Sequence, residues 1–481
     1  MMPESQFSVV VIGAGPGGYA AAFLAADLGL SVALVDEEAN PGGVCLYRGC
    51  IPSKALLHVA KLVEEAKHAS AWGVEFGAPR VDLDRLRGFK DQVVAKLTGG
   101  TGQLARQRKI TYVQGRATIL DPHTLRVTGQ AGEQAIRFEY GILATGSVPA
   151  RIPGLPESPR VIDSTGALDL ADVPGRLLVI GGGYIGLELG TVYAVLGSRV
   201  TVVEMLPGLL PGADRDLVNV LARRVERTFE AVRLETKVVG MKDEADGLRV
   251  TLQGAGGAAV EAVFDRALMA VGRRPNARIP GLEHTRVRVD DKGFIEVDAQ
   301  RRTAEPSLFA VGDVAGEPML AHKASHEGRV AAEVIAGRKV AYDPVAIPAV
   351  VFTDPELAWC GLTETQARAE PREVDVVRFP WAASGRAISI DRPDGLTKLL
   401  VDRATGRLLG MGIVGAGAGE LIAEGVLAVE MGAMASDVGL SIHPHPTLSE
   451  TVMEAADAFY GHATHIHRPR RRQDDGAGPR A

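Results

Sequence analysis

Two of the three cysteines in this 481-residue chain, Cys45 and Cys50, lie close together in the stretch GGVCLYRGCIPSKALLH. In an ideal α-helix, positions five apart lie too far apart for the ~5.5 Å Cα spacing of a disulfide, so the segment between the cysteines must bend. Gly49 permits such a bend, and the residues after it are typical of a helix with Pro52 in its first turn. Cys50 would then lie at a helix N-terminus, where the helix dipole and Lys54 favour a thiolate. The pattern predicts a redox-active thiol pair.

Independent burial of the two cysteines and half of a zinc site are the alternatives. A zinc site lacks a second nearby pair of Cys or His residues at normal spacing, whereas independent burial stays open. The third cysteine, Cys360, lies in the apolar run ELAWCGL without a partner, so we expect it to be structural.

A dithiol that cycles needs an acid or base, and the stretch SIHPHPTLSETVMEA supplies candidates. His443 and His445 each precede a proline, which stiffens the backbone, and Glu450 follows where it could orient an imidazole. Thr447 with Glu450 also fits the S/T-x-x-E capping box, so Glu450 could serve only to begin the final helix. The residues alone leave both roles open.

The elements that must position these groups begin with a strand at residues 7–13, a glycine turn, an alanine-rich helix and a second strand. Gly13, Gly15 and Gly18 fit G-x-G-x-x-G, and Asp36 ends the second strand, where a carboxylate can bind ribose hydroxyls. A lone pattern of this kind is weak evidence. It predicts a βαβ unit that binds a dinucleotide.

The same pattern returns near the middle of the chain in GRLLVIGGGYIGLELGTVYAVLGSRVTVVE. Gly181, Gly183 and Gly186 form the second fingerprint, and Glu204 closes its second strand. A carboxylate there accepts hydrogen bonds from a free 2′-hydroxyl and repels a 2′-phosphate, so we expect NAD rather than NADP.

Two carboxylates, Asp313 and Glu188, and one amine, Lys54, each have two interpretations. Asp313 follows an apolar strand in AEPSLFAVGDVAG and could bind a ribityl hydroxyl or act as a helix N-cap. Lys54 and Glu188 could pair near a cofactor ring or lie on the surface as separate charges.

Composition bounds the remaining possibilities. A formal net charge of −6 argues against general affinity for nucleic acid or membranes, and no apolar run approaches the ~20 residues of a membrane helix. Three cysteines suggest a reducing compartment, so we expect a cytoplasmic protein. In the polar, proline-interrupted stretch from residue 462, His462, His465 and His467 are expected in solvent rather than on a metal, and we expect no metal site.

The motifs GCIPSKALL, GYIGLELG, MLAHKASHEG and HPHPTLSE together resemble the class I pyridine nucleotide-disulfide oxidoreductases over nearly the whole chain, and within that family the dihydrolipoamide dehydrogenase branch. The resemblance implies an α/β fold with two Rossmann-like dinucleotide-binding domains and a C-terminal α+β dimerisation domain. The implied domains are an FAD-binding domain (1–150), an NAD-binding domain (151–275), a central segment that completes the FAD site (276–345), the dimerisation domain (346–461) and a disordered tail (462–481).

The resemblance also implies two cofactors. The residues implied for FAD are Gly13, Gly15, Gly18, Asp36, Lys54, Ala117, Ser147, Asp313, Met319, Leu320, Ala321 and His322. Those implied for NAD are Gly181, Gly183, Gly186, Glu204, Val238 and Gly272, and Glu188 would pair with Lys54 near the flavin.

The implied reaction carries electrons from dihydrolipoamide through a Cys45–Cys50 disulfide and FAD to NAD. Cys45 would exchange with the substrate, Cys50 would face the flavin as a thiolate, and His445, oriented by Glu450, would move the proton. The resemblance further implies a homodimer in which this histidine comes from the other subunit, with lipoyl domains of 2-oxo acid dehydrogenase complexes or the glycine cleavage protein as partners.

Some residues depart from the family pattern, and other functions compete. Tyr47 and Arg48 stand where smaller or apolar residues are common. Asp36 stands where a glutamate is more usual, and Pro444 where an alanine is common. Arg48 near the thiols could make the disulfide more oxidising. Glutathione reductase would be expected to have basic residues where Glu204 lies. Mercuric reductase and the larger thioredoxin reductases need another C-terminal thiol pair, and no cysteine follows Cys360. A flavin-binding scaffold without catalysis is the remaining alternative.

Overall fold

The computed structural model describes residues 4–130, 132–369 and 371–467. The chain divides into two compact units: unit 1 comprises residues 1–205 and 233–343, and unit 2 comprises residues 206–232 and 344–481. Both glycine fingerprints lie in unit 1. Residues 206–232 fall within the expected NAD-binding domain (151–275) and group by their contacts with unit 2; the domain bounds stay a prediction.

The first sheet of unit 1 has the order β3-β2-β1-β6-β5-β4, with β17 paired to β6. Its strands β1, β2, β3, β6 and β17 run parallel, whereas β4, β5 and β6 form an antiparallel meander. Val9, Val10 and Val11 of β1 are all 0% exposed, because a central parallel strand is covered on both faces. The strands are β1 (Glu4–Ile12), β2 (Val32–Asp36), β3 (Thr111–Gln114), β4 (Arg116–Asp121), β5 (Thr124–Gly129), β6 (Gly132–Leu143) and β17 (Leu308–Ala310).

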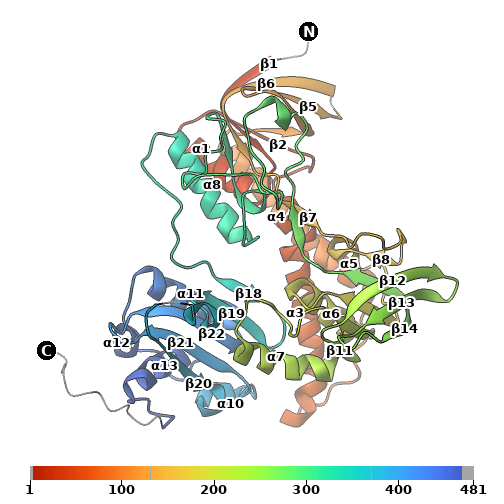
Figure 1. Cartoon of the computed structure of the whole chain (residues 1–481), viewed down its shortest axis with the longest axis vertical. Coiled ribbons are helices and arrows are strands. Elements are labelled where there is room, and N and C mark those ends of the chain that lie inside the picture. The colour runs from red at the N-terminus through yellow and green to blue at the C-terminus, as the bar shows by residue number, and fades with distance from the viewer. Residues whose placement is uncertain (1–3, 131, 370, 468–481) are drawn as a thin grey trace. The chain divides into compact units, whose positions relative to one another are not determined.

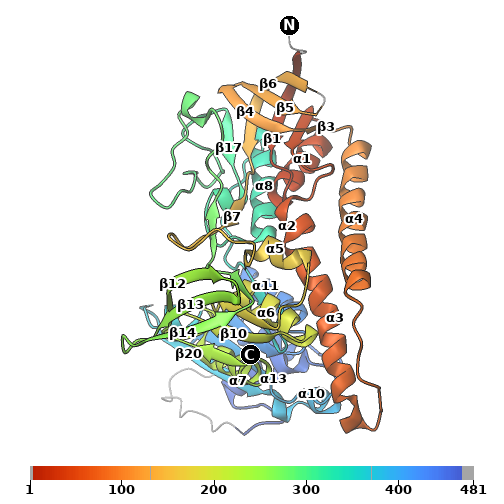
Figure 2. The same cartoon turned by 90° about the vertical axis from the view of Figure 1, so that its right-hand side faces the viewer.

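Helices α1 (Pro16–Asp27) and α8 (Ala321–Ile335) lie side by side against this sheet (Figure 1). The long helices α3 (Cys50–His68) and α4 (Leu83–Gln107) pack against each other (Figure 2), and the short α2 (Gly43–Arg48) precedes α3. The first glycine turn lies between the carboxyl end of β1 and the start of α1.

The second sheet of unit 1 is parallel along β10-β9-β15-β8, and β11 lies at its edge where the chain re-enters the unit. A three-stranded antiparallel sheet, β12-β13-β14, and a ribbon of β7 and β16 complete the unit. The elements are β7 (Ser147–Pro149), β8 (Val161–Ile162), α5 (Ser164–Asp169), β9 (Arg176–Ile180), α6 (Tyr184–Leu196), β10 (Arg199–Val203), β11 (Ala231–Arg233), β12 (Lys237–Glu244), β13 (Gly247–Gln253), β14 (Ala259–Phe264), β15 (Arg266–Met269) and β16 (Arg273–Pro275).

Unit 2 is built on a five-stranded antiparallel sheet of order β18-β19-β22-β21-β20. The runs LTKLLVD and LLGMGIVG form β21 and β22, and ELIAEGVLAVEMG forms most of α11 and the turn after it, as the sequence predicts. The elements are α7 (Arg215–Thr228), β18 (Ala349–Val351), β19 (Glu356–Gly361), α9 (Glu364–Ala367), β20 (Val374–Pro380), α10 (Gly385–Ser389), β21 (Leu396–Asp402), β22 (Leu408–Gly415), α11 (Ala418–Glu430), α12 (Ala435–Leu440) and α13 (Glu450–Tyr460).

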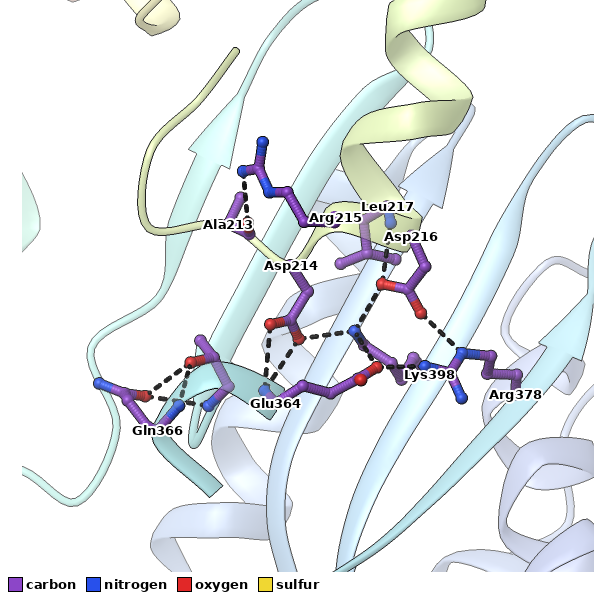
Figure 3. A network of polar contacts seen from close by, with 10 residues as sticks. Ala213, Asp214, Arg215, Asp216, Leu217, Glu364, Gln366, Arg378 and Lys398 are labelled. Carbon is purple, nitrogen blue, oxygen red and sulfur yellow. Dashed lines mark hydrogen bonds and ion pairs between the residues drawn. The ribbon is translucent and has the colours of Figure 1, made fainter. Parts of the chain in front are cut away.

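A buried ion network joins α7 to this sheet (Figure 3). Lys398 of β21 is 0% exposed, and its ammonium contacts Asp214 at 2.6 Å, Asp216 at 2.7 Å and Glu364 at 3.0 Å. Arg378 of β20 contacts Asp216 and Glu364 from the other side. Asp214 and Asp216 lie at the start of α7, so this network explains why residues 206–232 belong to unit 2.

The start of the predicted tail has defined contacts. Glu454 of α13 accepts hydrogen bonds from the backbone N–H groups of Thr464 and His465, and its carboxylate lies 2.6 Å from Nδ1 of His465. Residues 468–481 lie outside the described part of the chain. Within that part, no helix combines the length and the apolar character that crossing a membrane requires.

Candidate redox active site

The two cysteines of interest are brought together by a bend between two helices of unit 1. Cys45 lies in α2, and α3 begins at Cys50, as the sequence predicts. A Cβ atom on Gly49 would lie 2.8 Å from the carbonyl oxygen of Val44, so this position has no room for a larger residue. The hydroxyl of Ser53 donates to the carbonyl oxygen of Cys50 at 3.0 Å and fixes the first turn of α3.

The two thiols of this pair differ in acidity. A hydrogen bond from Cys45 lowers the pKa of Cys50 to about 7, although burial opposes the shift, and the positive charge of Lys54 adds to it. The same hydrogen bond and burial raise the pKa of Cys45. At neutral pH, therefore, Cys50 is the thiol that ionises and Cys45 stays protonated.

Lys54 and Glu188 form an ion pair rather than separate surface charges. Lys54 Nζ on α3 lies 2.7 Å from Glu188 Oε2 on α6, and the Glu188 side chain is only 3% exposed. Both residues line the same cavity as the thiols. The pair thus joins the thiol-bearing helix to the helix that follows the second glycine turn.

A cavity of about 440 Å³ extends from the first glycine turn to the thiol pair. Gly13 has φ +95°, and a Cβ there would lie 2.4 Å from the carbonyl oxygen of Ala144. A Cβ on Gly18 would lie 1.8 Å from the carbonyl oxygen of Gly13. Gly15 is the N-cap of α1 without a side-chain cap, and Gly15, Pro16 and Gly17 at this helix start line the cavity.

Asp36 lines this cavity at the end of β2. It accepts hydrogen bonds from the backbone N–H groups of Ala14 at 2.6 Å and Glu38 at 3.0 Å. Burial raises the pKa of its carboxyl group, against these hydrogen bonds and the charge of Arg48. The glycine turn, the open helix start and the acidic strand end fit a diphosphate and a ribose, so the residues present suit FAD.

Asp313 lies at the cavity in a single helical turn, η3 (Gly312–Val314). The hydroxyl of Ser147 donates to Asp313 Oδ2 at 2.5 Å, and Arg273 Nε donates to the same hydroxyl at 2.7 Å. The N-cap interpretation of Asp313 is wrong, because α8 begins at Ala321 with Leu320 as its N-cap.

The second glycine turn repeats the geometry of the first. Gly181 has φ +110°, and Cβ atoms on Gly181 and Gly186 would lie 2.4 Å and 2.3 Å from backbone carbonyl oxygens. Gly183 caps α6 without a side-chain hydrogen bond. Glu204 is buried directly after β10 and accepts a hydrogen bond from the backbone N–H of Gly182 at 2.7 Å, so its carboxylate lies at this turn.

The remaining predicted residues differ in their relation to the cavity. Met319 and Ala321 line it, whereas Ala117, Leu320 and His322 do not. Ala117 lies in β4 within the core, and its role stays a prediction. Val238 lies in β12 against the core of the second sheet, and Gly272, with φ +109°, accepts a hydrogen bond from Ala150.

Tyr184 and Arg273 are among the cavity-lining residues that sequence reasoning missed. Burial raises the pKa of Tyr184 to about 12, so its phenol is neutral. Tyr184 directly follows the fingerprint glycine Gly183, and Arg273 directly follows Gly272; these positions are the local signals that could have found them. Arg48 also lines the cavity, but its guanidinium pairs with Glu38 rather than with the thiols.

The candidate acid and base lie in unit 2. His445 Nδ1 lies 2.9 Å from Glu450 Oε1, and the imidazole is 76% exposed. Glu450 Oε2 accepts the backbone N–H of Thr447 at 2.8 Å, so one carboxylate both orients the imidazole and closes the turn before α13. Burial raises the pKa of Glu450, but the hydrogen bonds from Thr447 and His445 hold it below its ordinary value.

His443 has a different environment from His445. Its Nε2 lies 2.7 Å from Glu424, its Nδ1 lies 2.8 Å from the carbonyl oxygen of Ser441, and its side chain is 7% exposed. Both ring nitrogens of His443 are therefore engaged, whereas His445 presents its second nitrogen on an exposed ring. Of the two histidines, His445 is the more exposed, and its role as acid or base stays a prediction.

Cys360 is separate from this chemistry. It is 1% exposed in β19, and burial raises the pKa of its thiol to about 12.

Comparison with known proteins identifies relatives over nearly the full length. A dihydrolipoyl dehydrogenase of Vibrio cholerae is 49% identical over 467 residues, covering 97% of this chain and 98% of its own. Dihydrolipoyl dehydrogenases of Haemophilus influenzae and Thermus scotoductus are 50% and 48% identical over 97% and 96% of this chain, and 98% and 99% of theirs.

Solved structures show the same fold. LpdA of Mycobacterium tuberculosis superposes with a TM-score of 0.86 at 26% identity, and the HOCl-induced flavoprotein disulfide reductase RclA of Escherichia coli with 0.83 at 29% identity; each comparison covers 94% of this chain and 99% of the other. Residues 7–328 match the family model for pyridine nucleotide-disulphide oxidoreductases, and residues 347–456 match that family's dimerisation domain. The chain belongs to the pyridine nucleotide-disulphide oxidoreductase family.

Proposed function

We propose that this protein oxidises dihydrolipoamide to lipoamide and reduces NAD to NADH, with FAD as the intermediate carrier. The observation that carries the proposal is the thiol pair of unequal acidity in a cavity that also reaches the first glycine turn. Three relatives at 48% to 50% identity with the name dihydrolipoyl dehydrogenase support this substrate.

The residues of the chain divide the sulfur chemistry between them. His445 accepts a proton from one thiol of the substrate, and the resulting thiolate attacks Cys45 Sγ of the Cys45–Cys50 disulfide. Cys50 leaves as a thiolate, and a mixed disulfide joins the substrate to Cys45. The second substrate thiol then attacks the substrate sulfur that is bonded to Cys45 in the mixed disulfide. This step releases lipoamide, frees Cys45, and leaves two electrons in the Cys45–Cys50 dithiol.

Bound in the cavity at Gly13, Gly15, Gly18 and Asp36, FAD would supply the two-electron redox chemistry that links the dithiol to NAD. The ion pair of Lys54 with Glu188 lies at the cavity, where the Lys54 ammonium favours the Cys50 thiolate. Glu204 lies at the second glycine turn, where a carboxylate accepts the ribose hydroxyls of NAD and repels the 2′-phosphate of NADP.

The active form is proposed to be a homodimer with His445 facing the thiol pair of the partner subunit. The family's dimerisation domain covers residues 347–456 of unit 2, which contains His445, whereas the thiols lie in unit 1. Large apolar side chains of this domain are exposed, among them Leu427 (65%), Met431 (76%), Leu440 (82%) and Ile442 (98%). Burial of this apolar surface would stabilise a dimer.

The physiological substrate would be the lipoyl domain of a 2-oxo acid dehydrogenase complex or of the glycine cleavage system. Steady-state turnover with dihydrolipoamide and with glutathione, each with NAD and NADP, tests the proposal. Of these four combinations, we expect turnover only with dihydrolipoamide and NAD. Turnover with reduced glutathione and NADP, or FAD binding without any dihydrolipoamide oxidation, would contradict it. Cys45→Ser is the matched control, because it should retain FAD and lose turnover.

A further inference from the structure

Three charged residues of unit 1, two of them buried, form an ion triad and are not among the residues that line the cavity. Glu327 and Lys323 lie one turn apart on α8 and are 0% and 5% exposed. Glu327 Oε1 lies 3.1 Å from Lys323 Nζ and 2.9 Å from Arg301 Nη1, and the Arg301 side chain is 13% exposed. Desolvation of charges opposes folding, so a buried ion triad is weak evidence for stability by itself. Its contacts with the backbone indicate another role.

The triad holds both ends of the turn that carries Asp313. Glu327 Oε2 accepts the backbone N–H of Gly312 at 2.6 Å. Lys323 Nζ donates to the carbonyl oxygen of Gly316 at 2.9 Å and lies 3.4 Å from that of Gly312. The two charged side chains of α8 thereby supply hydrogen-bond partners that this irregular segment lacks in its own secondary structure. Asp313 lies between the two held positions and faces the cavity.

The same helix also holds the first turn of α1. A Cβ on Gly328 would lie 2.3 Å from the carbonyl oxygen of Gly17, so α8 and α1 are in direct backbone contact there (Figure 1). The hydroxyl of Ser325 donates to the carbonyl oxygen of Pro16 at 3.2 Å. Helix α8 therefore fixes two separate parts of the cavity wall, the helix start at the glycine turn and the turn with Asp313.

We propose that Glu327, with Lys323 and Arg301 as its counter-ions, is a positioning residue for the FAD site. It fixes the segment 312–316 and, through it, the carboxylate of Asp313, which Ser147 holds from the other side. A carboxylate that is already fixed loses little conformational freedom when it binds a ligand hydroxyl. Without Glu327 the segment must become ordered as FAD binds, so FAD should be held less tightly.

The test is the rate at which FAD leaves the purified holoenzyme, followed by the rise of flavin fluorescence on dilution. Glu327→Gln keeps the shape of the side chain and removes its charge. We expect it to release FAD about 10-fold faster, which corresponds to ordering a few side chains on binding. Glu333→Gln is the matched control, because Glu333 lies on the same helix in an outer ion pair with Arg338. It should release FAD at the rate of the unmodified protein.

A double-mutant cycle separates positioning from a general effect on the fold. Asp313→Asn and Glu327→Gln are measured singly and together. If Glu327 acts through Asp313, the double variant should release FAD about as fast as Asp313→Asn alone. The proposal would be overturned if the two substitutions multiplied each other's effect on the rate of FAD release. It would also be overturned if Glu327→Gln released FAD at the rate of the unmodified protein. If Glu327→Gln does not fold, Lys323→Gln takes its place in the same cycle, with the same two outcomes deciding.

This inference rests on the proposed function only in taking FAD as the ligand of the cavity. FAD release needs neither dihydrolipoamide nor NAD. A protein that releases FAD as expected but does not oxidise dihydrolipoamide would contradict the proposed substrate and leave the role of Glu327 standing.

Discussion

Removing the buried ammonium of Lys398 should destabilise unit 2 strongly. Lys398 is 0% exposed and contacts three carboxylates within 3.0 Å (Figure 3). In Lys398→Met these carboxylates would be opposed by the guanidinium of Arg378 alone, which leaves a net charge of −2 in the network. Breaking a buried ion pair by removing one partner costs about 3–5 kcal/mol, a large fraction of the ~5–15 kcal/mol that stabilises a domain.

The destabilisation should depend on pH with a definite sign. Burial raises the pKa of Asp216, but the hydrogen bonds from Lys398 and Arg378 hold it below its ordinary value. Its stabilising contribution is therefore present above its unfolded pKa and is lost as pH falls through the lowered folded pKa. In Lys398→Met, Asp216 loses one of the two cations that hold its pKa down, so the pKa of Asp216 rises. The difference in unfolding free energy between the two proteins should thus be larger at pH 7 than at pH 4.5.

Guanidinium unfolding, followed by tryptophan fluorescence at fixed protein concentration, measures this difference. Trp359 and Trp381 lie in unit 2, and Trp381 is 0% exposed, whereas Trp72 lies in unit 1 and is already 50% exposed; both proteins therefore also contain Trp72→Phe, so that the signal reports on unit 2. Arg403→Met is the control, because Arg403 pairs with Glu373 and Asp375 at the surface and should contribute little. A difference below about 1 kcal/mol at pH 7, or one that is the same at both pH values, would refute the argument that the network's charges are desolvated.

Three further predictions concern the active site. In the reduced protein, thiolate absorbance should show Cys50 ionising with a midpoint near pH 7. Cys45→Ala should raise this midpoint, because the hydrogen bond from Cys45 is lost. An unchanged midpoint would contradict this cause. Gly18→Ala should abolish FAD binding, since its Cβ would lie 1.8 Å from a carbonyl oxygen, so a yellow purified variant would be contrary evidence. Glu450→Gln should lower kcat with dihydrolipoamide by about 10²-fold, because this reaction uses His445. Flavin reduction by NADH does not use His445 and should be unaffected. A kcat within twofold of the unmodified protein would contradict a role for the His445–Glu450 pair.

The parts of the site that the sequence predicts are those that depend on neighbours close in the chain. Gly18 needs only the turn that it forms with Gly13, and the helix that begins at Cys50 follows from the bend at Gly49. Each of these features is specified within about 30 residues. Local spacing therefore contains the whole physical cause, and the prediction agrees with the structure.

The parts that the sequence could not predict depend on residues far apart in the chain. Arg273 and Ser147 are 126 residues apart, and Ser147 and Asp313 are 166 apart, so no local pattern indicates their contacts. The assignment of residues 206–232 to unit 2 depends on Lys398, which is 184 residues from Asp214. A lysine in a strand pattern gives no sign of complete burial, because burial is decided by the carboxylates that the fold brings to it.

The unequal acidity of the two thiols determines where a substrate should attack the disulfide. A thiolate that attacks one sulfur expels the other, and exchange is faster when the leaving thiol has the lower pKa. In the disulfide Cys45 has no proton to donate, so the charge of Lys54 beside the start of α3 is what makes Cys50 the better leaving group, and attack at Cys45 is favoured on electronic grounds. Lys54 also pairs with Glu188, whose negative charge raises the pKa of Cys50. Removing Glu188 should therefore sharpen the preference for attack at Cys45, whereas removing Lys54 should weaken it. The direction of exchange is thus set by the charges beside Cys50, independently of which subunit supplies His445.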